Sequence, residues 1–410
     1  AFWDTETYCL PFYLFSDPQA ARNLLLFRYA TLPMAKERAK ELDLNGACYP
    51  IATLNGHESC ALWQHASLQP QPSTAVAFAI DHYVRNTGDE AFLGAYGLEM
   101  LIEISRYLLA RGDYNPDKTK FGFYGVMGPD EFQMMVHHNA YTNYMGMATF
   151  DTTLKALTQI KKVDPDDYRA VLEKTGLKTT EIKAFREAME KTFLPYDPKT
   201  RLYEQHQGYF DLPHIDIKKI PEKEFPLYAH WSYDRIYRND MIKQPDVLMF
   251  LFLYNSRFSL AVKRANYEFY EPRCIHESSL SPSIHSVLAA ELDKDAEAAK
   301  FFEFATRMDL DDFNRNAAEG LHLTSIAAAW VNIVYGFGGL RSDGALLRIA
   351  PKLPPAWTGY AFHLNYRGVR LSFEVVKGET SITADRDLDE PLVIYREKVW
   401  LKAGTTVFAR

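Results

Sequence analysis

Hydrophobic periodicity divides this sequence into a long helical part and a short part made of strands. Up to about residue 335, apolar side chains recur at the three- and four-residue spacing of amphipathic helices, with Gly, Pro, Asn or Asp clusters between segments. Many segments come in consecutive pairs, which predicts an array of helical hairpins, either an open solenoid or a closed α/α barrel. We favour the barrel because no repeat of fixed period is visible. Helices are predicted at residues 73–87, 90–111, 139–160, 179–193, 241–254, 258–269, 283–291, 295–308 and 324–335, and two more begin near residues 18 and 34.

The pattern changes after Gly336-Phe337-Gly338-Gly339. Short runs of alternating apolar and polar residues follow, split by Gly and Asp, which predicts a small antiparallel β-sandwich. We place the boundary near residue 345, so the expected domains are residues 1–345 and 346–410. A chain of 410 residues exceeds the roughly 250–300 residues at which single cores stop growing, in agreement with one large and one small domain. The predicted strands are residues 360–366, 369–376, 380–385, 392–395, 399–401 and 405–408.

Charge and composition exclude several classes of function. The net charge is −7 and no long run of Lys or Arg occurs, which argues against nucleic-acid binding. No apolar run approaches the roughly 20 residues of a membrane span, so no membrane association is expected. The four cysteines form no CxxC pair, which predicts reduced thiols in a cytoplasmic protein and no zinc motif. The chain opens on Ala1-Phe2-Trp3-Asp4 without an initiator Met, so we expect a fragment.

The stretch Gly128-Pro129-Asp130-Glu131-Phe132 contains the strongest catalytic candidate. Glu131 follows a tight turn and precedes a predicted helix, and Phe132, Met134 and Met135 are near enough in sequence to exclude water. Desolvation raises the pKa of a carboxyl group, so Glu131 is predicted to keep its proton and to serve as a general acid. The alternative is that Asp130 and Glu131 cap the helix that follows.

Further stretches combine polar and aromatic residues more densely than packing requires, and each has a structural alternative. Trp3-Asp4 is either a binding pair or a buried indole with its hydrogen-bond partner, and Lys243-Gln244 is either functional or a solvated helix start. A helix N-terminus rich in hydroxyls can hold an anion, although the same residues are good N-caps. The remaining stretches are 230–233, 276–283 and 320–326.

Metal binding is not expected from the histidines in these stretches. His276 and His322 have no second His four residues away, and the HExxH spacing is absent. The sequence therefore predicts no metal site.

Taken together and in this order, the motifs of the chain resemble those of glycoside hydrolase family 65. These enzymes are the disaccharide phosphorylases for maltose, trehalose, kojibiose, nigerose and related α-glucosides. The resemblance covers nearly the whole chain and is carried by Phe2-Trp3-Asp4-Thr5-Glu6, Gly128-Pro129-Asp130-Glu131-Phe132, Asn139-Ala140-Tyr141-Thr142-Asn143, Lys243-Gln244-x-Asp246-Val247, Ser278-Ser279-Leu280-Ser281-Pro282 and His322-x-Thr324-Ser325-Ile326.

The resemblance implies a fold and an assembly. It implies an (α/α)₆ barrel, incomplete at its N-terminal end, followed by a small jelly-roll-like antiparallel sandwich. A large N-terminal β-sandwich domain is expected to be missing from the chain and to pack on the barrel. Relatives also suggest a homodimer.

The resemblance also implies the roles of individual residues. Glu131 corresponds to the general acid. The glucose-binding residues correspond to Trp3, Asp4, Lys243 and Gln244. The phosphate-binding residues correspond to Ser278, Ser279, His322, Thr324 and Ser325. The partners are a disaccharide and inorganic phosphate as co-substrate, with no metal and no organic cofactor.

The implied chemistry agrees with a single catalytic carboxylate. An inverting glycosidase needs an acid and a water-activating base, whereas phosphate is already an anionic nucleophile and needs no base. Glu131 would protonate the glycosidic oxygen while phosphate attacks from the far side, giving β-glucose 1-phosphate.

Two alternatives to a phosphorylase stay open, and so does the identity of the acceptor sugar. One is an inverting α-glucosidase, with Glu277 or Glu319 as the second carboxylate, and the other is an inactive sugar-binding fragment. Residues 69–75, with Trp63-Gln64-His65, depart from many relatives and are expected to help shape the acceptor pocket. This departure favours a nigerose, kojibiose, polyol or rhamnose type of acceptor over plain maltose or trehalose.

Overall fold

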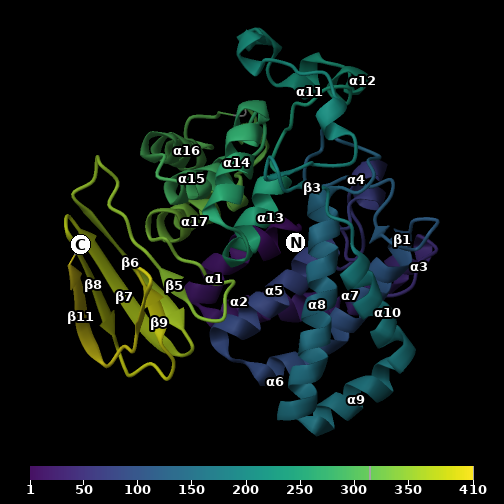
Figure 1. Cartoon of the computed structure of the whole chain (residues 1–410), viewed down its shortest axis with the longest axis horizontal. Coiled ribbons are helices and arrows are strands. Elements are labelled where there is room, and N and C mark those ends of the chain that lie inside the picture. Colours follow the sequence, from purple (N-terminus) through teal and green to yellow (C-terminus); the bar gives the residue numbers. More distant parts are fainter. Residues whose placement is uncertain (314, 410) are drawn as a thin grey trace.

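The computed structural model describes residues 1–313 and 315–409, apart from the side chain of Glu319. The chain is mainly helical from Thr5 to Phe337 and forms strands from Arg348 to Ala409 (Figure 1). The predicted class, a mainly helical domain followed by a small antiparallel β domain, is confirmed. No helix in the described part of the chain is both long and apolar enough to cross a bilayer.

The helices of the large domain begin and end close to where the sequence predicts. Asn139 caps helix α8 by accepting a hydrogen bond from the Thr142 amide, and Asp17 caps α2 just before Pro18. Apart from α9, which is described below, the helices of six or more residues are α1 (Leu10–Ser16), α2 (Pro18–Ala30), α3 (Leu32–Glu41), α4 (Trp63–Leu68), α5 (Gln71–Thr87), α7 (Leu98–Arg111), α8 (Ala140–Val163), α10 (Thr179–Lys191), α13 (Val247–Leu253), α14 (Leu260–Tyr270), α15 (Ser281–Glu291), α16 (Asp295–Arg307) and α17 (Leu323–Val331).

Two differences from the prediction have simple physical causes. Helix α9 (Pro165–Thr175) was not predicted, because most of its residues are polar and Val171 is its one buried residue. The helix expected from residue 241 begins only at Val247, because the preceding residues are held in an irregular loop by hydrogen bonds to Asp130.

The helices form an inner and an outer layer. Helices α5, α8, α13 and α15 bury residues around most of their circumference, whereas α2, α10 and α16 bury a single face. Neighbouring pairs such as α7 with α8, α13 with α15 and α15 with α16 pack against one another. Two layers of helices are what a barrel of helical hairpins requires, and its closure by six pairs stays a prediction.

The small domain contains two sheets. The larger has the order β11-β8-β7-β6 and is antiparallel throughout, built from β6 (Gly359–Tyr366), β7 (Val369–Val376), β8 (Glu379–Ala384) and β11 (Gly404–Ala409). The smaller has the order β10-β9-β5 and contains β5 (Arg348–Ile349), β9 (Leu392–Ile394) and β10 (Glu397–Val399). Strand β5 pairs with β9 in parallel, which the sequence pattern did not indicate.

The small domain contacts the helical domain away from the cavity described below. The Asn365 side chain donates a hydrogen bond to the Ser16 carbonyl at the end of α1, and Tyr360 donates to the carbonyl of Phe337. The stretch between Phe337 and Arg348 contains neither helix nor strand, so we propose the domain boundary there, near residue 345.

Candidate active site

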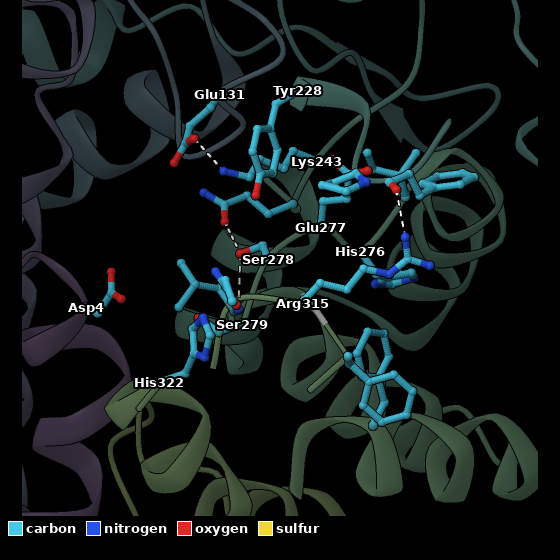
Figure 2. Close-up of a pocket in the computed structure, with 18 of the residues that line it drawn as sticks. Asp4, Glu131, Tyr228, Lys243, His276, Glu277, Ser278, Ser279, Arg315 and His322 are labelled. Carbon is cyan, nitrogen blue, oxygen red and sulfur yellow. Dashed lines mark hydrogen bonds and ion pairs between the residues drawn. The ribbon is translucent and has the colours of Figure 1, made fainter. Parts of the chain in front are cut away.

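A cavity of about 420 Å³ opens where loops from distant parts of the helical domain converge. In Figure 2, Glu131 lies above the open space that Asp4 faces, and Ser279 and His322 lie below it. Its volume falls in the range of roughly 300–1,000 Å³ that small-molecule sites occupy. The lining residues are Phe2, Trp3, Asp4, Glu131, Phe225, Pro226, Tyr228, Lys243, Gln244, Ile275, His276, Glu277, Ser278, Ser279, Leu280, Phe304, Phe313, Arg315, Asn316 and His322.

The loop that carries Glu131 is held by two buried carboxyl groups. Asp246 accepts a hydrogen bond from the Asp130 amide (2.6 Å) and one from the Asn139 side chain (2.6 Å). Asp130 in turn accepts from the amide of Lys243 (2.9 Å) and from the side chain of Gln205 (2.8 Å). Burial raises the pKa of both carboxyl groups. The alternative that Asp130 and Glu131 cap the next helix is wrong, because Asn139 is the cap.

Gly128 shows why this loop begins with glycine. A Cβ atom at Gly128 would lie 2.2 Å from Oδ2 of Asp246 and less than 3 Å from the Asn139 amide group. No other residue therefore fits without moving the carboxylate that holds the loop.

The charge state of Glu131 differs from the one predicted. Burial alone would raise its pKa, but Lys243 Nζ lies 2.6 Å and His65 Nε2 3.5 Å from the same oxygen, Oε2. These two groups outweigh burial and lower the pKa of Glu131 from 4.5 to about 2. Met135, which was expected to exclude water, is instead 52% exposed. In the free site, Glu131 is therefore an ionised carboxylate.

Trp3 and Asp4 are fixed by a buried ion pair two residues further on. Glu6 accepts two hydrogen bonds from Arg28, at 2.6 and 3.0 Å, and the Arg28 side chain is fully buried. Asp4 accepts a hydrogen bond from the Thr324 hydroxyl (2.8 Å), while its other oxygen, Oδ1, is buried without a partner. Burial, only partly offset by the Thr324 hydrogen bond, raises the pKa of Asp4 to about 7.

Lys243 and Gln244 join the two sides of the cavity and are not a solvated helix start. Lys243 contacts Glu131, whereas Gln244 donates from its amide to the Pro129 carbonyl and accepts from the Ser278 hydroxyl. The Glu131 loop and the Ser278–Ser279 loop are thus connected through one side chain.

The His322-x-Thr324-Ser325 motif reaches the cavity through His322 itself. Asp309 accepts hydrogen bonds from the His322 ring (2.5 Å) and the His322 amide (2.8 Å), which orients the imidazole. Thr324 contacts Asp4 and is absent from the cavity lining, and the Ser325 hydroxyl donates to the Ala305 carbonyl (3.0 Å) on α16. Among the described residues, the predicted site residues other than Thr324 and Ser325 border one cavity.

Comparison with protein families decides where the chain belongs. Residues 1–331 match the model of the glycosyl hydrolase family 65 central catalytic domain, and residues 340–398 match that of the family 65 C-terminal domain. The chain belongs to glycosyl hydrolase family 65. This agrees with the motifs in the sequence and with the mainly helical domain followed by a small β domain.

Individual relatives of this family 65 chain are phosphorylases by name. It is 38% identical to the maltose phosphorylase of Bacillus subtilis strain 168, over 92% of this chain and 50% of that protein. It is also 38% identical to the α,α-trehalose phosphorylase of Thermoanaerobacter brockii, over 98% of this chain and 52% of that protein. A solved structure of a putative kojibiose phosphorylase from human microbiome covers the whole chain with a TM-score of 0.95 and 52% identity. The chain spans about half the length of these curated relatives and 60% of that solved chain.

Several residues bordering the cavity of this family 65 chain were not singled out from the sequence. Phe225 and Arg315 come from irregular loops, and Tyr228 comes from α11 (Leu227–His230), a single turn too short for periodicity to mark which side chain faces inward. The polar aromatic stretch 230–233, which was singled out, does not line the cavity; Trp231 packs in a small satellite core and donates to Glu224 (2.6 Å). The aromatic-rich stretch around residues 225–233 was the available signal in the sequence. It did not show that residues 225 and 228 face the cavity whereas residues 230–233 do not.

The stretch expected to shape the acceptor pocket lies behind the Glu131 loop instead. The Gln69 side chain donates to the Gly128 carbonyl (3.1 Å), and the Met127 amide donates to the Leu68 carbonyl (2.9 Å). Residues 69–75 are buried and do not line the cavity. His65, on α4, contacts Glu131 directly.

Proposed function

We propose that this family 65 chain carries the catalytic centre of an inverting glycoside phosphorylase acting on an α-linked glucosyl disaccharide or glucoside. Glu131 is the general acid, phosphate is the nucleophile, and the products are β-glucose 1-phosphate and the acceptor. Glucose lies against Trp3 and Asp4, with Lys243 and Gln244 beside the scissile bond. The proposal is supported by one partly exposed carboxylate, that of Glu131, facing a hydroxyl- and histidine-bearing loop region across a single cavity.

The accessibility of the other carboxylates in the cavity favours phosphorolysis over hydrolysis. A hydrolase on this scaffold needs a second carboxylate with an oxygen open to water, to serve as base. Asp4 has one oxygen bonded to Thr324 and the other buried, and its pKa of about 7 leaves it partly protonated at neutral pH. Glu277 has one oxygen bonded to the Leu227 amide (2.5 Å) and the other buried. The side chain of Glu319 lies outside the described residues.

Substrate binding has to change the charge state of Glu131 before it can donate a proton. While Lys243 holds Oε2, the carboxylate stays ionised at neutral pH. A sugar hydroxyl that draws the Lys243 ammonium away removes one of the two groups that lower the pKa of Glu131, and burial, then opposed by His65 alone, raises it. Acceptor binding is thereby coupled to protonation of Glu131, because Lys243 contacts the sugar and also controls the pKa of Glu131.

The anion side supplies donors for phosphate. Ser278 and Ser279 border the cavity next to His322, and phosphate accepts hydrogen bonds from hydroxyl and imidazole groups. Thr324 acts on glucose through Asp4, and Ser325 holds α17 against α16.

Four free thiols are consistent with the proposed cytoplasmic location.

The decisive experiment measures sugar release with and without phosphate. We expect β-glucose 1-phosphate in the presence of phosphate and little free glucose in its absence. In the reverse direction, β-glucose 1-phosphate is offered with a panel of acceptors that includes glucose, rhamnose and glycerol, and phosphate release identifies the acceptor. Glucose release at an equal rate without phosphate would overturn the phosphorylase and establish a hydrolase. No turnover in either direction would favour a sugar-binding fragment.

A further inference from the structure

Cys274, His276 and His285 form a compact cluster beside the Ser278–Ser279 loop. Cys274 and His276 precede that loop, and His285 lies in helix α15, which follows it. The Cys274 Sγ and one nitrogen of each histidine lie within 4.8 Å of one another, and Sγ is 3.6 Å from Nδ1 of His276. His276 also borders the cavity, where Figure 2 shows it near Glu277 and Ser278, so a small ion can reach the cluster.

The hydrogen bonds of the cluster leave one ligand atom unused. The His285 Nδ1 hydrogen is donated to the Ser281 carbonyl (2.9 Å), which makes Nε2 the acceptor nitrogen of a neutral ring. This Nε2 is buried and has no hydrogen-bond partner. A neutral imidazole with an accepting nitrogen is the form that binds metal ions.

The separations suit a borderline-soft cation. With Zn–S near 2.3 Å and Zn–N near 2.0–2.1 Å, a sulfur and a nitrogen on one tetrahedral ion are roughly 3.5 Å apart. The 3.6 Å between Cys274 Sγ and His276 Nδ1 agrees with that value. All three ligand atoms lie within 4.8 Å of one another, so the widest separation exceeds the value for a bound ion by at most about 1.3 Å, and binding requires the side chains to close that gap.

We propose that Cys274, His276 and His285 bind a zinc-like divalent cation through one sulfur and two nitrogens, with water as the fourth ligand. Binding replaces the thiol proton of Cys274, which is released to solvent as the thiolate–metal bond forms. Because the reaction proposed above needs no metal, the ion is an inhibitor and not a cofactor.

Inhibition follows from the position of the cluster. A metal on His276 Nδ1 displaces the hydrogen bond that this atom shares with Ser281 Oγ (3.0 Å). The ion then ties residues 274–276 to α15 across the loop that carries Ser278 and Ser279. Ser278 loses its freedom to turn from Gln244 toward phosphate, so phosphorolysis slows. This inhibitory effect, unlike the binding itself, rests on the proposed function.

Direct metal binding tests the site independently of activity. The protein is titrated with Zn²⁺ by calorimetry, and with Co²⁺ by near-ultraviolet absorption, in which a thiolate ligand gives a charge-transfer band. We expect one tight equivalent of Zn²⁺ and a thiolate–Co²⁺ band that Zn²⁺ removes. A protein that shows no such band, or no saturable zinc binding, overturns the proposal.

Matched variants identify the ligands. Cys274→Ser and His285→Gln should each weaken zinc binding at least tenfold and relieve zinc inhibition, whereas Cys60→Ser, a control thiol that is partly exposed, should leave both unchanged. If Cys274→Ser does not fold, His285→Gln and the spectrum of the unmodified protein decide. Zinc binding that persists in both variants, or disappears in Cys60→Ser, contradicts the assignment. Tight binding without loss of phosphorolysis retains the site and overturns the inhibition.

Discussion

The two sides of the cavity are built differently. On the acid side, Asp246, Asp130, Gln244 and Lys243 fix the loop of Glu131 through buried hydrogen bonds before any substrate is present. On the anion side, the groups assigned to phosphate are engaged with the protein's own atoms: His322 with Asp309, and Ser278 with Gln244.

This difference teaches which step each side controls. A carboxylic acid must meet the glycosidic oxygen at one position, and a loop held by buried hydrogen bonds supplies that position while only the Lys243 side chain has to move. Phosphate is a mobile, symmetric anion, and a side whose donors exchange partners can admit and release it. The proposed function therefore assigns the chemistry to the acid loop and the phosphate affinity to the loops opposite. The following predictions test that division, beginning with the largest effect.

Replacing the acid tests the rigid side most severely. Glu131→Gln keeps the shape of the side chain and removes the proton donor, so kcat with a disaccharide should fall roughly 10²–10⁴-fold. Steady-state kinetics measure the loss, with α-glucosyl fluoride as the control substrate, since departing fluoride needs little protonation. An equal loss with both substrates would mean that Glu131 positions the sugar and is not the acid.

Removing the buried carboxylate tests whether the acid loop is as firmly held as its hydrogen bonds suggest. Asp246→Ala leaves the Asp130 amide and the Asn139 side chain without their acceptor. Each lost partner should lower the free energy of unfolding by about 1–3 kcal/mol, and kcat should fall as the loop loosens. Denaturant unfolding measures the change, and Asp389→Ala on the surface is the control. Unchanged stability would show that the loop does not depend on Asp246.

The ion pair between Lys243 and Glu131 makes a prediction about pH. The folded-state pKa of Glu131, about 2, lies below its ordinary 4.5, so the pair stabilises the fold above about pH 5 and this stabilisation is lost as the pH falls towards 2. In Lys243→Met the downward shift of the Glu131 pKa becomes smaller, because only His65 still opposes burial. The difference in unfolding free energy between the unmodified protein and Lys243→Met should therefore shrink between pH 5 and pH 2.

Unfolding curves across this pH range measure that difference. Lys223→Met, on an exposed 3₁₀ turn, is the matched control. A difference that stays constant with pH would mean that Lys243 does not set the pKa of Glu131.

The smallest effect is expected at Ser325. Ser325→Ala removes a hydrogen bond to the Ala305 carbonyl, which should cost about 0.5–1.5 kcal/mol of stability and leave the KM for phosphate nearly unchanged. His322→Asn, at the cavity wall, should raise that KM roughly tenfold, since a hydrogen bond to a charged group is stronger. Phosphate titrations of the two variants make the comparison. An equal rise in both would show that Ser325 turns towards phosphate on binding.

Local sequence determined much of this molecule. The periodicity that separates helices from strands and the Asn139 cap follow from preferences that act within a few residues. The motifs also named the residues of the cavity wall, including Trp3, Glu131 and His322, because each motif keeps its chemistry in a short stretch.

Only the tertiary structure decided how those residues behave. Lys243 lies 112 positions from Glu131 in sequence, yet their contact turns the predicted neutral acid into a carboxylate. Thr324 meets Asp4 across 320 positions, and Ser325 turns to the neighbouring helix. Sequence patterns report short-range preferences. The electrostatic field that sets the pKa of a side chain depends on groups that folding brings together from anywhere in the chain.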